Sequence, residues 1–182
     1  MNDVMEERRI VRDVLSGNRE SFALLVRAHE GLVRSLCLSI LRNSAEADDA
    51  AQEVFVKAFK SLGSFRSDAS FSSWMYRIAY RHCVDVIRSG RRRRTEALDA
   101  MDVDQFRERT SSTDDRLDVR RALELLSPDE RMVLTLREVQ GLTYEEISEV
   151  LEVSLDGVKG RLKRARRSLQ EKARHLFQVS NV

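Results

Sequence analysis

The sequence lacks the patterns that mark membrane-inserted or exported proteins. No apolar run approaches the roughly 20 residues that a membrane-spanning helix needs. The first stretch, MNDVMEERRIVRDV, carries too many charges for the apolar centre of a signal peptide. We therefore expect a cytoplasmic protein without membrane insertion.

The sequence also lacks the usual signatures of a metal centre or an enzyme. Its two cysteines, Cys37 and Cys83, lie in helical apolar patterns without a CxxC pair or nearby histidines, so buried free thiols are expected. The three histidines, His29, His82 and His175, are scattered, and neither a glycine-rich phosphate loop nor HExxH occurs. We expect no catalytic residue, no metal and no cofactor.

The distribution of charge is more informative than its total. The formal net charge is only +2. However, Arg88 and residues 91–94 form one basic cluster, residues 159–174 form another, and the segment between them is acidic. The near-neutral total therefore conceals two cationic patches.

Apolar residues recur at three- and four-residue steps in both halves of the chain, which predicts an all-α fold. The N-terminal half should contain a short helix that ends at a turn over 16–18, a long helix over 22–41, and a third helix capped near Asn43. A fourth helix should begin at Phe71. His29 lies on the apolar stripe of the long helix, where we expect a core or boundary imidazole.

Acidic residues crowd the first half of the third helix. The helix dipole explains Glu46 and Asp48, which lie near the N-terminus. It explains Gln52 and Glu53 less well, because they lie beyond the first turn. From the pattern alone, a partner surface and a solvated face remain equally open for this segment.

The fourth helix carries aromatic and cationic residues that invite two interpretations. Tyr76, Arg77 and Tyr80 fall off its apolar stripe, and rings beside guanidinium groups are typical of proteins that bind single-stranded nucleic acid. Trp74, taken alone, is better explained as a large core residue. The helix runs into RSGRRRR, whose arginines cannot be buried together and should attract phosphates.

The stretch TEALDAMDVDQFRERTSSTDD, residues 95–115, divides the chain. It holds seven acidic and two basic residues, and its TSST run is typical of an unfolded connector. We therefore predict two small helical domains, 1–94 and 116–182, joined by a flexible acidic linker.

The second domain should contain a helix-turn-helix between Leu142 and Ala165. Thr143 and Glu146 form a capping box for one short helix, and Ser154 is placed to cap the next. This second helix has an apolar side and a cationic side, as a helix in a DNA major groove requires. The alternative is a solvated basic helix in an ordinary bundle.

These features together resemble an extracytoplasmic-function RNA polymerase sigma factor of the sigma-70 family. The resemblance covers nearly the whole chain. It rests on EADDAAQEVFVKAF at 46–59, SFRSDASFSSWMYRIAYRHCVDVIR at 64–88, LSPDERMVLTLREVQGLTYEEISEVL at 126–151 and GVKGRLKRAR at 157–166.

The resemblance implies a set of partners and site residues for a protein that is not an enzyme. The partners would be promoter DNA, a cognate anti-sigma factor and core RNA polymerase, through the clamp helices of its largest subunit and the flap of its second-largest subunit. The polymerase-binding residues would be Asp49, Gln52, Glu53 and Phe55. The residues that contact the −10 element would be Phe65, Arg66, Asp68, Phe71, Trp74, Tyr76, Arg77, Arg81, Arg88, Arg91 and Arg92. Those at the −35 element would be Thr143, Lys159, Gly160, Arg161, Lys163, Arg164 and Arg167.

Three positions depart from the pattern of the family. Arg81 stands where many members carry asparagine, Glu152 where glycine is usual at the turn, and Gly160 where a serine is usual in the recognition helix. Glu152 costs about 1 to 2 kcal/mol if its φ is positive. The promoter sequence that this chain prefers is therefore the property that the family resemblance predicts least well.

Two other functions are compatible with the residues. A free-standing helix-turn-helix regulator would bind duplex DNA tightly as a dimer without polymerase. A helical adaptor would use its charged faces for protein contacts, and its binding would not respond to salt as DNA binding does.

Overall fold

The computed structural model describes residues 2–66, 70–98, 123 and 125–179, and every regular element in these ranges is helical. The all-α prediction is confirmed. The elements are α1 (Asn2–Leu15), η1 (Arg19–Ser21), α2 (Phe22–Leu41), α3 (Ser44–Ser61), η2 (Leu62–Ser64), α4 (Phe71–Leu98), α6 (Pro128–Leu134), η3 (Thr135–Val139), α7 (Tyr144–Leu151) and α8 (Leu155–Val179). None of the described helices is both long and apolar enough to cross a membrane.

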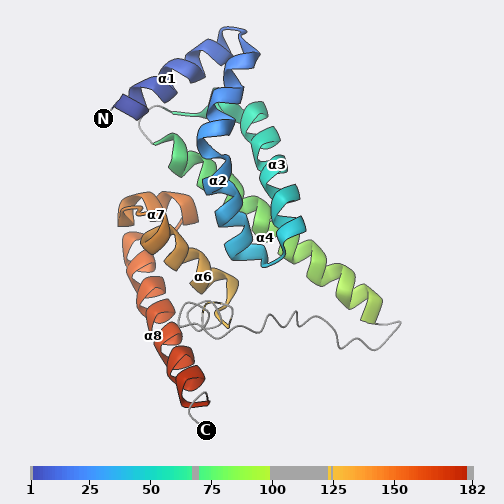
Figure 1. Ribbon diagram of the computed structural model, residues 1–182, viewed down its shortest axis with the longest axis vertical. Helices are drawn as coiled ribbons and strands as arrows, with labels where there is room; N and C mark the ends of the chain where they lie inside the picture. The colour runs from blue at the N-terminus through green and yellow to red at the C-terminus, as the bar shows by residue number, and fades with distance from the viewer. Residues whose placement is uncertain (1, 67–69, 99–122, 124, 180–182) are drawn as a thin grey trace.

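The helices α2, α3 and α4 pack against one another and form the first bundle (Figure 1). Alanines line the inner face of α3, and their small side chains let this helix approach α2 closely. The predicted cap is present, because Asn43 Oδ1 accepts a hydrogen bond from the Glu46 amide at 3.1 Å. Cys37 and Cys83 are buried free thiols, as expected.

The fourth helix extends further than the predicted domain boundary. It continues to Leu98, so the first four residues of the predicted linker are helical. In Figure 1, the C-terminal part of α4 projects beyond α3. The remainder of the predicted linker, residues 99–115, lies outside the described residues.

The second bundle comprises α6, η3, α7 and α8. Ser127 and Glu130 form a complete capping box at the start of α6, with Pro128 in its first turn. The helix that begins at Pro128 changes at Thr135 into the π-helical turn η3. There the Gln140 amide donates to the Thr135 carbonyl at 2.9 Å. An apolar period does not distinguish this wider turn from an α turn.

The two bundles are in direct contact, with α7 against α4 and α6 against α2. The guanidinium of Arg131 lies at the centre of the second contact and is only 6% exposed. It donates to the carbonyls of Ser39 at 2.8 Å and Ile40 at 3.4 Å, in the last turn of α2. It also donates to the carbonyls of Leu123 and Leu126 in its own bundle. One side chain therefore satisfies backbone acceptors of both bundles.

Tyr76 lies in the other contact. It falls off the apolar stripe of α4, yet the residue is only 2% exposed. Its hydroxyl donates to Gln140 Oε1 at 2.7 Å, and burial raises its pKa to about 12. The apolar stripe reports packing within the first bundle, whereas Tyr76 is buried by the second. An ion pair between Arg81 and Glu152 lies in the same contact.

Replacing Arg131 should destabilise the association of the two bundles. Arg131→Ala leaves buried carbonyls of both bundles without their donor, which should lower the free energy of unfolding by about 3 kcal/mol. Urea denaturation measures this loss. Arg164→Ala, which removes an exposed guanidinium from α8, should change stability by less than about 0.5 kcal/mol. Equal effects of the two substitutions would contradict the role given to Arg131.

Tyr76 should ionise well above the ordinary value for a tyrosine. While the two bundles are in contact (the closed arrangement), the pKa of Tyr76 is about 12, whereas the ordinary pKa of tyrosine is 10.0. The contact should therefore lose stability as the pH rises from about 10 to 12. Ultraviolet titration of tyrosinate should show a late step that Tyr76→Phe removes. If Tyr76→Phe instead removes a titration step near pH 10, the Tyr76 side chain faces water in solution.

Candidate nucleic-acid interface

The helix-turn-helix has the predicted layout. Glu152 ends α7 with φ at 54°, so the residue that replaces the usual glycine does occupy the left-handed region. The Ser148 hydroxyl donates to the Val153 carbonyl at 2.6 Å and fixes the turn. Ser154 then caps α8, because its Oγ accepts from the Gly157 amide at 3.1 Å. Buried Val158 and Leu162 hold α8 against the bundle.

The cationic side chains of α8 divide into paired and unpaired groups. Lys159 pairs with Asp156 at 3.2 Å, and Arg167 pairs with Glu171 at 2.8 Å. Within the part of the chain that the structure describes, the other three predicted cations, Arg161, Lys163 and Arg164, form no ion pair. Exposed pairs contribute only about 0 to 1 kcal/mol, so phosphates can displace them. Among the described residues, Arg161, Lys163 and Arg164 have no ion pair of this kind to break.

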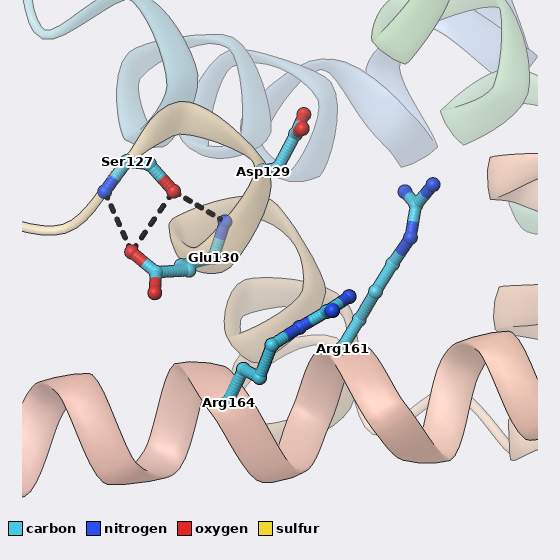
Figure 2. Close-up of a pocket in the computed structure, with 5 residues that line it drawn as sticks. All are labelled: Ser127, Asp129, Glu130, Arg161 and Arg164. Carbon is cyan, nitrogen blue, oxygen red and sulfur yellow. Dashed lines mark hydrogen bonds between the residues drawn. The ribbon is translucent and has the colours of Figure 1, made fainter.

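Arg161 and Arg164 border a shallow pocket of about 270 Å³ between α8 and the start of α6. Figure 2 shows both side chains rising from α8 on the side where α6 lies, and Ser127, Asp129 and Glu130 line the pocket with them. Glu130 is fixed by hydrogen bonds to the amide and hydroxyl of Ser127, both 2.9 Å long. Burial raises its pKa, but the bonds from Ser168 and Ser127 outweigh burial and lower the pKa below its ordinary value. Glu130 therefore stays charged near these arginines.

The remaining two −35 candidates differ in what they offer to DNA. The Thr143 hydroxyl is occupied by the capping box of α7, where it accepts from the Glu146 amide at 3.2 Å and donates to Glu146 Oε2 at 3.0 Å. Gly160 is exposed, and a Cβ added there would meet no atom within 4 Å. The serine usual in the family would therefore fit at this position without a clash.

Three of the −10 candidates form one aromatic cluster at the start of α4. The ring centroids of Phe65 and Phe71 are 5.4 Å apart, and each lies 5.5 Å from the centroid of Trp74. Phe71 and Trp74 are buried, which agrees with the core interpretation of Trp74, whereas Phe65 is half-buried. Only the Phe65 ring therefore offers a partly open face.

The structure places the remaining −10 candidates in different environments. Arg66 and Arg88 are exposed, Arg77 is half-buried, and Arg81 is paired with Glu152 of the other bundle. Asp68 lies outside the described residues, and Arg91 and Arg92 belong to α4 but their side chains are not described. Arg81 therefore touches the other bundle while much of its side chain stays exposed to solvent.

The acidic face of α3 is open, and its residues have distinct partners. Asp49, Gln52 and Glu53 are exposed and Phe55 is half-buried. The neighbouring Asp48 is instead held by Arg34 at 2.5 Å. Lys57 Nζ lies 2.7 Å from His82 Nδ1, and burial followed by the charge of Lys57 lowers the pKa of His82. A neutral His82 accepts the hydrogen bond of Lys57, one turn from Glu53.

Sequence patterns did not reveal the contacts that three residues of the second bundle make with α4. Gln140, Glu146 and Glu152 reach α4 from the second bundle, with Ser73 Oγ donating to Glu146 Oε1 at 3.4 Å. No local pattern could assign them, because their partners lie more than sixty positions away in the chain.

Comparisons with curated relatives cover almost the entire chain. It is 33% identical over 190 residues to the ECF RNA polymerase sigma-E factor of Escherichia coli (strain K12), covering 97% of this chain and 99% of that protein. It is 32% identical over 179 residues to the RNA polymerase sigma-H factor of Pseudomonas aeruginosa, covering 91% and 93%.

Solved structures share the fold. CnrH in complex with the cytosolic domain of CnrY matches with a TM-score of 0.67 and 27% identity, covering 90% of this chain and 94% of that one. The sigma factor RpoE of Bartonella quintana, in complex with the anti-sigma factor NepR, also has a TM-score of 0.67, at 23% identity, covering 85% and 98%.

Two family profiles match the chain, one over each bundle. Sigma-70 region 2 matches residues 25–93, and sigma-70 region 4 matches residues 116–169. The first range holds the aromatic cluster and the acidic face of α3, and the second holds the helix-turn-helix. The chain belongs to the extracytoplasmic-function sigma factors of the sigma-70 family.

Proposed function

We propose that this protein directs core RNA polymerase to a specific set of promoters and opens them. Residues 1–94 would bind the polymerase and the −10 element, residues 95–115 would connect the domains, and residues 116–182 would bind the −35 element. The observation that carries the proposal is the coexistence, in one chain of this family, of an open acidic face on α3 and unpaired cations on α8.

The acidic face of α3 is suited to the clamp helices of the largest polymerase subunit. Asp49, Gln52 and Glu53 are exposed side by side, and Phe55 adds an apolar contact at the edge of the core. Charged and apolar groups in one exposed helix face are what a specific docking surface needs. The second domain would contact the flap of the second-largest subunit.

Promoter binding requires the two bundles to separate. Tyr76, Trp74 and Arg81 contribute to −10 recognition under this proposal, yet α7 covers this part of α4. Polymerase can hold the domains apart. Once one domain has bound its promoter element, the other domain is present at a high effective concentration near its own element. The closed arrangement is therefore a state of the protein without DNA.

An anti-sigma factor is the partner expected to act on the free protein. The B. quintana sigma factor RpoE was solved with the anti-sigma factor NepR, and CnrH, which shares the fold, was solved with the cytosolic domain of CnrY. A comparable protein would compete with polymerase for this chain. We place the protein in the cytoplasm, as a transcription initiation factor without catalytic activity of its own.

In vitro transcription tests the proposal directly. Purified core polymerase, with and without this chain, is supplied with a genomic promoter library, and the start sites are sequenced. A distinct set of starts should appear only when both components are present. A nanomolar footprint by the chain alone would instead support a free-standing regulator.

Reversing the charge of Glu53 should weaken polymerase binding. Glu53→Arg places a cation in the acidic face of α3 and should raise the Kd for core polymerase about tenfold, as the loss of a close charge contact does. Fluorescence anisotropy of labelled protein measures this. Glu20→Arg, an exposed change in η1, serves as the control, and equal affinity of the two variants would remove Glu53 from the interface.

Removing the guanidinium of Arg161 should relax the choice of −35 sequence. A base contact of this type contributes about 1 to 3 kcal/mol of discrimination, so Arg161→Ala should flatten the preference at one or two positions. Start-site sequencing with the variant holoenzyme gives the preference. Arg174→Ala, an exposed change later in α8, should leave it unchanged. An unaltered preference with Arg161→Ala would assign the reading to other side chains.

A further inference from the structure

The first helix lies outside both segments that the family profiles match. The region 2 profile begins at residue 25, whereas α1 spans Asn2–Leu15. Nevertheless α1 contacts α2 and η2, and its Val11 and Val14 are buried in the core. In Figure 1, α1 crosses one end of the first bundle. This helix is therefore an integrated part of the domain.

One polar contact links α1 to the inside of the bundle. Glu7 Oε1 lies 2.8 Å from Nε2 of His29, and the His29 side chain is only 6% exposed. The Glu7 carboxylate is itself sheltered, with 18% of its side chain exposed. The sequence predicts that His29 is a core residue, and the structure confirms this and adds a carboxylate partner from another helix.

The other side of the imidazole faces the aromatic cluster. The ring centroids of His29 and Phe71 are 5.2 Å apart, with an angle of 52° between the planes. Phe71 in turn packs on Phe65 and Trp74. A continuous chain of contacts therefore runs from α1 through one imidazole to the only partly open ring of the cluster, Phe65.

The hydrogen bond between Glu7 and His29 orients the imidazole ring in addition to packing it. An apolar side chain in place of His29 would avoid the cost of burying polar groups, so packing alone does not require the pair. A directional bond to Nε2 fixes the plane of the imidazole, as partners of buried histidines generally do. The orientation of this ring then sets the surface on which Phe71 rests.

We propose that Glu7 and His29 form a positioning pair that holds the aromatic cluster in the geometry needed to capture the separated −10 strand. This role rests on the proposed function. Neither side chain touches the DNA; both act through Phe71. The first helix thereby becomes part of the promoter-opening apparatus, although it lies outside the matched region 2 segment.

The test compares Glu7→Ala with Glu6→Ala in the assembled holoenzyme. Glu6 is the exposed neighbour on the same helix, so the control removes an equal charge. The probe is a fluorescent single-stranded oligonucleotide that carries the non-template −10 segment of a promoter used by the wild-type holoenzyme. Glu7→Ala should bind this strand about tenfold more weakly than Glu6→Ala, as expected when a buried polar group loses its partner.

Two further readouts separate positioning from general support of the fold. Affinity for core polymerase and for a −35 duplex should be the same in both variants. The emission of Trp74, the only tryptophan in the chain, should change in Glu7→Ala alone. Equal capture of the single strand by the two variants would overturn the proposal. A parallel loss of core and duplex binding would overturn it too, because α1 would then only stabilise the domain.

A double-mutant cycle tests whether the two residues act as a unit. His29→Phe keeps a ring beside Phe71 but removes the nitrogen that faces Glu7. Combined with Glu7→Ala, it should cause no greater loss of strand capture than either change alone. Additive losses would overturn the pairing. If the wild-type holoenzyme initiates at no promoter, the proposed function itself is wrong. This result is obtained before any variant is made, so it is distinguished from a failure of the pairing.

Discussion

The contact around Arg131 is the constraint on which the closed arrangement depends. The last carbonyls of a helix have no partner within the helix, and they carry the negative end of its dipole. At the end of α2 the guanidinium of Arg131 supplies both a hydrogen-bond donor and a positive charge to these carbonyls. The end of α2 is therefore completed by a residue of the other bundle, so the packing of each bundle depends on the other.

The helix α7 contacts both α4 of the first bundle and α8 of its own bundle. Its capping residue Glu146 accepts from Ser73 of α4, and Glu152 at its C-terminus pairs with Arg81. The same helix supports α8 through the turn at Glu152, where φ is 54°. A glycine would relieve the backbone strain at this turn but would remove the carboxylate that faces Arg81. Glu152, which replaces the usual glycine, thus contributes an ion pair to the contact between the bundles.

Sequence patterns predicted what depends on local chemistry and missed what depends on distant partners. The caps at Asn43, Thr143 and Ser154 were predictable because the donor and acceptor lie three residues apart. The long helix α2 followed from its apolar period. The burial of Tyr76 was not predictable, because a stripe of apolar residues describes only the bundle to which its helix belongs. The proposed sites themselves came from the family resemblance, since exposure alone gives a residue no role.

The polar character of the contact between the bundles determines how easily it opens. An ordinary hydrogen bond contributes only about 0.5 to 1.5 kcal/mol net, because water replaces the lost partner, and an exposed ion pair such as Arg81 with Glu152 contributes less. Buried Arg131 and Tyr76 therefore contribute more to closing than the exposed ion pair does. If the open form is a small fraction of the free protein, its apparent affinity for polymerase falls by that fraction. Under the proposed function, binding to polymerase that exceeds this cost would open the molecule, and the few buried polar groups of the contact would set the threshold between the closed and the promoter-bound states.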